Sequence, residues 1–162
     1  DLAGLVTDAV NDAALAAPTH RWVTALPDTP VWVRGDPSRL HQLVSNLLGN
    51  ARVHTPPGVT VTTGIACHVV PEGGPGTSYA ELDVADDGPG IDPELVPRLF
   101  ERFARADTSR SNGSGIGLGL AIVSSIVKAH TATVTAESAD GRTVFRVRIP
   151  MIDPPVPART PG

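Results

Sequence analysis

Apolar residues recur at helical spacing in three stretches of the chain. The clearest stretch follows Asp36-Pro37 and ends at the Pro56-Pro57-Gly58 turn, with apolar side chains at Leu40, Leu43, Val44, Leu47, Leu48 and Ala51. Steps of three and four residues place these side chains on one face of a helix. Asp36 is the expected N-cap of this helix and Pro37 its first residue. Residues 2–16 and 116–130 show the same periodicity, and residues 93–103 predict a shorter helix.

Alternation of apolar and polar residues predicts the strands. The segments with this pattern, or with short apolar runs between turn residues, are 20–26, 31–33, 59–69, 79–84, 131–138 and 142–149. The last two flank Asp140-Gly141, a strong hairpin signal. Antiparallel strand pairs mixed with helices of unequal length predict an α/β sandwich, in which helices cover one face of a single sheet.

Strand alternation also assigns two reactive side chains to a face of the sheet. In segment 59–69, Cys67 shares the face of Val61, so we expect a buried thiol. Asp86 continues the face of Val84, so its carboxylate is expected to point toward the core.

Composition and charge restrict the classes of function. The chain has 162 residues, about one domain, and a formal net charge of −4 without a basic run, so a nucleic-acid partner is not indicated. Its single cysteine excludes an internal disulfide, and no apolar stretch approaches the roughly 18 residues of a membrane span. Because the only methionine is Met151, we expect a piece of a longer protein. The five prolines within residues 150–162 predict a flexible tail over 151–162, after one domain over 1–150.

Three segments carry candidate chemistry, and each has an ordinary structural alternative. Gln42, Asn46, Asn50 and His54 form a polar line along the longest helix, where amide oxygens suit a hard cation already neutralised by phosphates. The alternative for this line is a solvated helix face.

The second segment is Asp86-Asp87-Gly88-Pro89-Gly90-Ile91. A buried Asp86 needs a donor, and its glycines allow a flat group to approach the backbone. An adenine amino group meets both demands, whereas guanine has a carbonyl at that position. The alternative is an ordinary turn after a strand.

The third segment, 113–120, alternates glycines and continues into a helix. Its backbone N–H groups and the helix dipole suit phosphates, with a flexible hinge as the alternative. Arg105 and Arg110 precede these glycines and are candidate contacts to phosphate oxygens, although solvated surface arginines are an equal interpretation.

Together and in this order, the segments resemble the ATP-binding catalytic domain of sensor histidine kinases, in the superfamily shared with the Hsp90, gyrase B and MutL ATPases. The matching boxes are Asn46-Leu47-Leu48-Gly49-Asn50-Ala51, Asp86-Asp87-Gly88-Pro89-Gly90-Ile91, Leu99-Phe100-Glu101-Arg102-Phe103 and Gly115-Ile116-Gly117-Leu118-Gly119-Leu120. The phenylalanine box favours the kinases over the other ATPases. The resemblance covers about residues 1–150 and implies a Bergerat-type ATP-binding fold, a two-layer sandwich whose mixed, mostly antiparallel sheet carries helices on one face.

The resemblance implies ATP and Mg²⁺ as ligands. Asn50, supported by Asn46, would hold the metal, Asp86 would accept from the adenine amino group, and residues 104–115 would form a lid over the nucleotide. The implied nucleotide-binding residues are Asn46, Asn50, His54, Asp86, Gly88, Gly90, Ile91, Arg105, Arg110, Gly115, Gly117, Leu118, Gly119, Leu120 and Thr143.

Two departures from the family's pattern qualify this expectation. The lysine that often follows the second asparagine by three residues is Val53 here. None of the five histidines stands in the family's phosphoacceptor context, so no catalytic residue is assigned within this chain.

The resemblance implies partners that lie outside the chain. These are a dimerisation domain that carries the phosphoacceptor histidine of the same kinase, and a downstream response regulator. The domain alone is expected to be monomeric and to form the cytoplasmic part of a membrane-anchored sensor. The alternatives are another enzyme of the superfamily, an ATPase or an anti-sigma type serine kinase, and a degenerate nucleotide-binding module.

Overall fold

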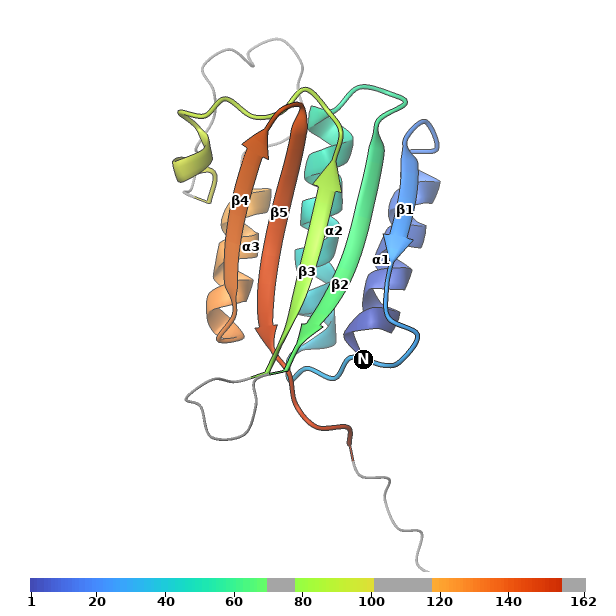
Figure 1. Cartoon of the computed structure of the whole chain (residues 1–162), viewed down its shortest axis with the longest axis vertical. Coiled ribbons are helices and arrows are strands. Elements are labelled where there is room, and N and C mark those ends of the chain that lie inside the picture. Colours follow the sequence, from blue (N-terminus) through green and yellow to red (C-terminus); the bar gives the residue numbers. More distant parts are fainter. Residues whose placement is uncertain (70–77, 101–117, 156–162) are drawn as a thin grey trace, which may run out of the picture.

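One mixed sheet and three helices make up the computed structural model, which describes residues 1–69, 78–100 and 118–155. The strands lie in the order β1-β2-β3-β5-β4. Their bounds are β1 Arg21–Ala25, β2 Thr60–His68, β3 Tyr79–Asp86, β4 Thr133–Ala139 and β5 Arg142–Pro150. The helices α1 (Leu2–Ala16), α2 (Pro37–His54) and α3 (Gly119–Ala129) all lie on one face of the sheet (Figure 1). The predicted two-layer α/β sandwich is confirmed.

Strand pairing places three residues that are distant in sequence, Asp86, Thr143 and Ser138, in one row across β3, β5 and β4. β1 runs parallel to β2, whereas the β2–β3, β3–β5 and β4–β5 pairs are antiparallel. In this register Thr143 of β5 lies opposite Asp86 of β3 on one side and Ser138 of β4 on the other. The predicted hairpin turn is present, since Asp140 and Gly141 both have positive φ values, 52° and 73°.

The core lies between the sheet and α2. All six apolar residues of the predicted α2 stripe are buried, as are Val61, Leu82, Val84, Phe145 and Val147 of the sheet. α2 begins as expected, because the Asp36 side chain accepts a hydrogen bond from the Arg39 N–H at 3.1 Å and Pro37 is the first helical residue. This packing fixes the face of α2 that carries Asn46 and Asn50.

Two expectations about secondary structure are wrong. Residues 31–33 form no strand: only Val33 bridges to Met151, and the Val31 and Trp32 carbonyls accept from Leu2 and Ile152. In place of a helix over 93–103, the described part has a short 3-10 turn, η1 (Val96–Arg98), because Pro97 lacks the N–H that an α-helix needs. Residues 101–103 lie outside the described ranges.

Cys67 is exposed, not buried. β1 pairs with β2 only as far as Gly64, so residues 66–68 of β2 extend past their neighbour and are exposed on both faces. Alternation assigned the thiol to the right face but did not show that this part of the face is uncovered.

The chain remains attached to the fold just beyond residue 150. Met151 N–H donates to the Ser78 carbonyl and Ile152 N–H to that of Trp32. Among the residues that the structure describes, no helix has both the length and the apolar character needed to span a bilayer.

Candidate functional site

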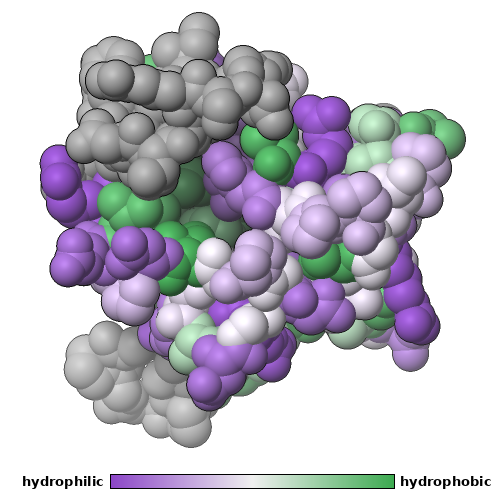
Figure 2. All heavy atoms as spheres, turned by 90° about the horizontal axis from the view of Figure 1, so that it is seen from above, coloured by the Kyte–Doolittle hydropathy of each residue, from purple (hydrophilic) through white to green (hydrophobic). Residues whose placement is uncertain are grey.

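Four elements converge at one end of the molecule. The C-terminal part of α2, the end of β3, the start of α3 and the β4–β5 hairpin lie at the top in Figure 1. Figure 2 looks onto this end and shows a hollow with an apolar floor and with hydrophilic residues along one side. Most of the described residues predicted to bind nucleotide belong to these elements or to the turn after β3.

Asn46 and Asn50 lie one turn apart on α2, both partly buried. The Asn46 Nδ2 atom is buried and has no hydrogen-bond partner among the described residues. A Cβ built on Gly119 would lie 3.5 Å from Asn46 Oδ1, so the start of α3 lies against this amide. A buried amide donor without a partner is costly, and an anionic oxygen of a bound ligand would satisfy it.

Asp86 ends β3 with its side chain turned toward the helices, as strand alternation predicted, and only 6% exposed. Its Oδ1 accepts the Gly88 N–H at 3.1 Å. Burial raises the pKa of the carboxyl, the Gly88 hydrogen bond lowers it, and the charge of Asp87 raises it. Burial is the largest effect, so Asp86 is a destabilised buried charge that a donor from a ligand would stabilise.

Gly88 is required by close packing. A Cβ at this position would lie 2.7 Å from Asp86 Oδ1 and 2.7 Å from Thr55 Cγ2, far inside ordinary contact. Thr55 caps the C-terminus of α2. The turn after β3 therefore lies directly against the end of the helix that carries Asn50.

Asp87 has a different role from Asp86. It is exposed, its Oδ1 accepts the Thr60 N–H at 2.7 Å, and its own N–H donates to the Thr60 carbonyl. These bonds attach the turn to the start of β2, so Asp87 is structural.

Two residues at this end, Ser138 and Thr55, were not predicted from the sequence. Ser138 Oγ accepts the Ile91 N–H at 2.8 Å and lies 3.3 Å from Thr143 Oγ1. Thr55 Oγ1 donates to the Ala51 carbonyl at 2.7 Å. Because that bond uses its only hydrogen, the His20 Nε2–H donates to Thr55 across 3.0 Å. The alternation of β4 could have assigned Ser138 to the inward face, but its partner lies 47 positions away in sequence.

The remaining predicted residues are divided between the site and its surroundings. Gly90 (φ +82°), Ile91 and Leu120 are partly buried beside the core, and Thr143 is buried. His54 and Leu118 are exposed at the end of α2 and before α3. Arg105, Arg110, Gly115, Gly117 and the whole of 104–115 lie outside the described residues.

The donor set at this end suits a hard cation bound together with phosphates. Amide oxygens from Asn46 and Asn50 are ligands that Mg²⁺ accepts, and Mg²⁺ usually keeps several waters and takes substrate phosphates as further ligands. No group of three or more His, Cys, Asp or Glu side chains with metal-binding geometry occurs within 1–69, 78–100 and 118–155.

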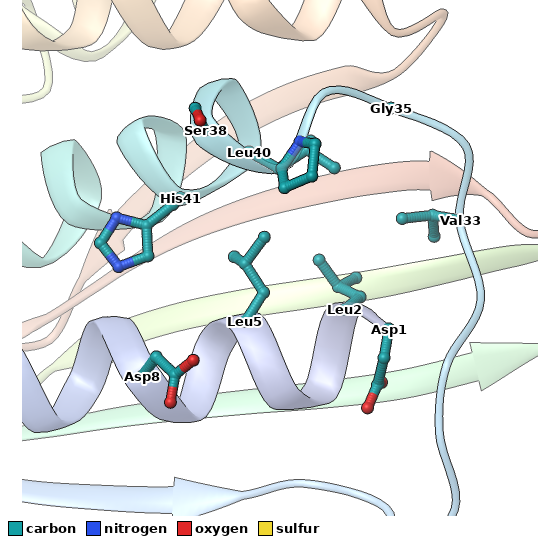
Figure 3. Close-up of a pocket in the computed structure, with 10 residues that line it drawn as sticks. Asp1, Leu2, Leu5, Asp8, Val33, Gly35, Ser38, Leu40 and His41 are labelled. Carbon is teal, nitrogen blue, oxygen red and sulfur yellow. The ribbon is translucent and has the colours of Figure 1, made fainter.

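A separate cavity of about 560 Å³ lies near the other end of α2. Figure 3 shows Leu2 and Leu5 of α1 facing Leu40 and His41 at the start of α2. At 1.5 Å per residue, Pro37 and Asn50 are roughly 20 Å apart along the helix, so this cavity is not part of the candidate site.

The class of protein to which this fold belongs is shown by comparison with known families. The family model described as histidine kinase-, DNA gyrase B- and HSP90-like ATPase matches residues 35–153, and the chain belongs to this family. Individual relatives show which type of ATPase domain this is.

The chain is 71% identical over 153 residues to the sensor histidine kinase TrcS and 51% identical over 152 residues to the probable sensor histidine kinase TcrY, both of Mycobacterium tuberculosis. These matches cover 94% and 93% of the chain but 30% of each relative. Among solved structures, the mycobacterial sensor histidine kinase MprB has a TM-score of 0.80 and 31% identity, covering 93% of this chain and 96% of that one. The domain is thus of the sensor histidine kinase type.

Proposed function

We propose that this domain binds Mg-ATP between α2, the turn after β3 and the start of α3, and presents the γ-phosphate to a histidine outside residues 1–162. The observation that carries the proposal is the pairing of a buried, pKa-raised carboxylate, Asp86, with the buried unpartnered amide of Asn46. The Asp86 carboxylate needs a hydrogen-bond donor and the Asn46 amide needs an acceptor. An adenine nucleotide offers both, in its amino group and its phosphate oxygens. A similar solved structure, ShkA, was determined in complex with AMPPNP; it is 28% identical, with a TM-score of 0.77, and covers 98% of this chain and 32% of that one.

In this proposal the base lies at the β3 turn. Asp86 accepts from the exocyclic amino group of adenine, Thr143 joins the same hydrogen-bond network, and Gly88 and Gly90 allow the ring to approach the backbone. Ile91 borders the ring with an apolar side chain.

The triphosphate lies along α2 toward α3. Asn50, with Asn46, holds Mg²⁺, which neutralises phosphate charge when bound. The N-terminus of α3 at Gly119 directs backbone N–H groups and a positive dipole toward the phosphates, beside Leu118 and Leu120. Gly115, Gly117, Arg105 and Arg110 are proposed as further phosphate contacts, and His54 as a neighbour of the nucleotide.

None of the five histidines stands in the phosphoacceptor context of the family, which supports a phosphoacceptor located elsewhere. Four of the five contact another polar group: His20 with Thr55, His41 with Asp12, His68 with Glu81 and His130 with Asp36. Phosphoryl transfer depends on aligning the nucleophile with the γ-phosphate and on neutralising charge. The domain supplies the ATP side, and a dimerisation domain of the same kinase supplies the histidine. A response regulator as next acceptor and a cytoplasmic position in a membrane-anchored parent are part of this proposal.

Calorimetry of the purified chain tests the proposal. ATP and ADP are expected to bind in the presence of Mg²⁺ and more weakly with EDTA, and GTP is expected not to bind. Equal binding of GTP and ATP would contradict the base assignment. Metal-independent binding would favour a degenerate nucleotide module, in line with the exposed Val53 in place of lysine. Steady ATP turnover by the chain alone would instead indicate an independent ATPase.

A further inference from the structure

Ser138 links the two segments that border the proposed adenine position. It lies on β4, facing the helices, and is partly buried. Its Oγ accepts the Ile91 N–H at 2.8 Å, and a Cβ on Gly90 would lie 3.2 Å from the same oxygen. On its other side it lies 3.3 Å from the Thr143 hydroxyl. One side chain thus contacts both the turn after β3 and the residue opposite Asp86.

Either hydroxyl could donate in the Ser138–Thr143 hydrogen bond, and counting the available hydrogens favours Ser138 as the donor. Ile91 donates to Ser138, so that contact leaves the Ser138 hydrogen unused. Between two hydroxyls one donates and one accepts. If Ser138 donates, the Thr143 hydrogen stays available on the side of Asp86, whose carboxylate can only accept when ionised. If Thr143 donated to Ser138 instead, its hydrogen would be used. The Thr143 oxygen and the Asp86 carboxylate would then lie side by side as two acceptors, which is unfavourable between buried groups.

We propose that Ser138 is a positioning residue that makes Thr143 a donor toward the base and thereby contributes to selecting adenine. This inference rests on the proposed function. Adenine presents a donor, its amino group, beside an acceptor, N1. Hypoxanthine and guanine present the reverse order, a carbonyl beside an N1–H. A carboxylate acceptor next to a hydroxyl donor therefore matches adenine and opposes the other two.

The test compares ATP with inosine triphosphate, which differs from ATP only at this edge of the base. Calorimetry with Mg²⁺ gives the ratio of the two dissociation constants for the wild type, Ser138→Ala and Thr135→Ala. Thr135 is on the same strand but on the exposed face. We expect Ser138→Ala to reduce the preference for ATP about three- to tenfold, the range for one lost hydrogen bond, and Thr135→Ala to leave it unchanged.

A second variant separates positioning from structure. Ser138→Thr keeps the hydroxyl and is expected to restore the preference. If Ser138→Ala does not fold, Ser138→Cys replaces it in the test. Because a thiol is only a weak donor and acceptor, this variant is expected to show the same reduced preference for ATP over inosine triphosphate. Equal loss of affinity for both nucleotides, or no change in either, would overturn the inference. Failure of the wild type itself to bind ATP, or to prefer it over GTP, would instead overturn the proposed function.

Discussion

A single carboxylate dominates the electrostatics of the site. Asp86 is 6% exposed, and its neighbourhood raises its pKa mainly by burial. In the nucleotide-free protein the ionised side chain is therefore unfavourable, and the folded state binds its proton more tightly than the unfolded state does. A buried carboxylate of this kind lowers the free energy of unfolding but can accept a hydrogen bond from a ligand.

Asp86→Asn should separate these two effects. The Asn oxygen can still accept the Gly88 N–H, but its NH₂ group would face the adenine amino group. We expect ATP affinity to fall roughly 10- to 150-fold, the cost of a charge-assisted hydrogen bond. The free energy of unfolding without nucleotide should rise at pH 7, and this gain should shrink as pH falls through the raised pKa, because the wild-type carboxyl is then protonated.

Urea unfolding at several pH values and calorimetry measure both effects. Asp87→Asn is the matched control, since Asp87 is exposed and bonded only to Thr60 in the described part; its ATP affinity should stay within about twofold of wild type. A destabilised Asp86→Asn protein at pH 7 would contradict the assignment of Asp86 as a costly charge.

Asn50→Ala tests the metal position. Because Asn50 is outside the buried apolar stripe of α2, the substitution should leave the fold intact. It should weaken ATP binding about tenfold or more with Mg²⁺ and have little effect with EDTA, as expected for a lost metal ligand. Gln42→Ala, on the same helical line two turns earlier, is the control. An unfolded Asn50→Ala protein would show that Asn50 is structural instead.

At the scale of elements, α2 connects the two ends of the molecule. It begins at the Asp36 cap, where the Asp36 N–H also donates to His130 Nε2 at the end of α3, and it ends beside the turn after β3. The N-terminal cap and the proposed ligand contacts therefore lie at opposite ends of one helix.

Asp36→Ala should affect stability alone. Loss of a side-chain cap costs about 1 kcal/mol, so the midpoint of urea unfolding should decrease without a change in the slope m. ATP affinity should not change, because Asn50 lies more than three turns away. Asp28→Ala, an exposed carboxylate between β1 and α2, is the control. Reduced ATP affinity with unchanged stability would contradict this division.

Periodicity predicted the helices and most strands because it reports which face of an element is buried. Asp86 was assigned to the inward face on this basis alone. The same rule failed for Cys67, because alternation does not show where a neighbouring strand stops. It failed for 93–103, where the apolar spacing was helical but Pro97 interrupts the hydrogen bonds. Ser138 and Thr55 could not be found locally, since their roles depend on contacts with turns far away in sequence.

At the scale of the whole molecule, the proposal divides the reaction between this chain, which binds ATP, and a separate domain, which carries the phosphoacceptor histidine. Incubated with radiolabelled ATP and Mg²⁺, the chain should not label itself. Addition of the dimerisation domain of the same parent kinase should label that domain's histidine, slowly, because the untethered pair lacks the high effective concentration of linked domains. Acid-labile phosphate on the chain alone would contradict the proposed division of labour.

The position of β5 has a consequence for synthesis of the protein. β5 is the last strand among the described residues but lies inside the sheet, between β3 and β4, with Phe145, Val147 and Ile149 at most 1% exposed. Until a ribosome has released these residues, β3 and β4 have open edges and Asp86 lacks Thr143 opposite it. A nascent chain that stops early therefore exposes apolar strands that favour aggregation.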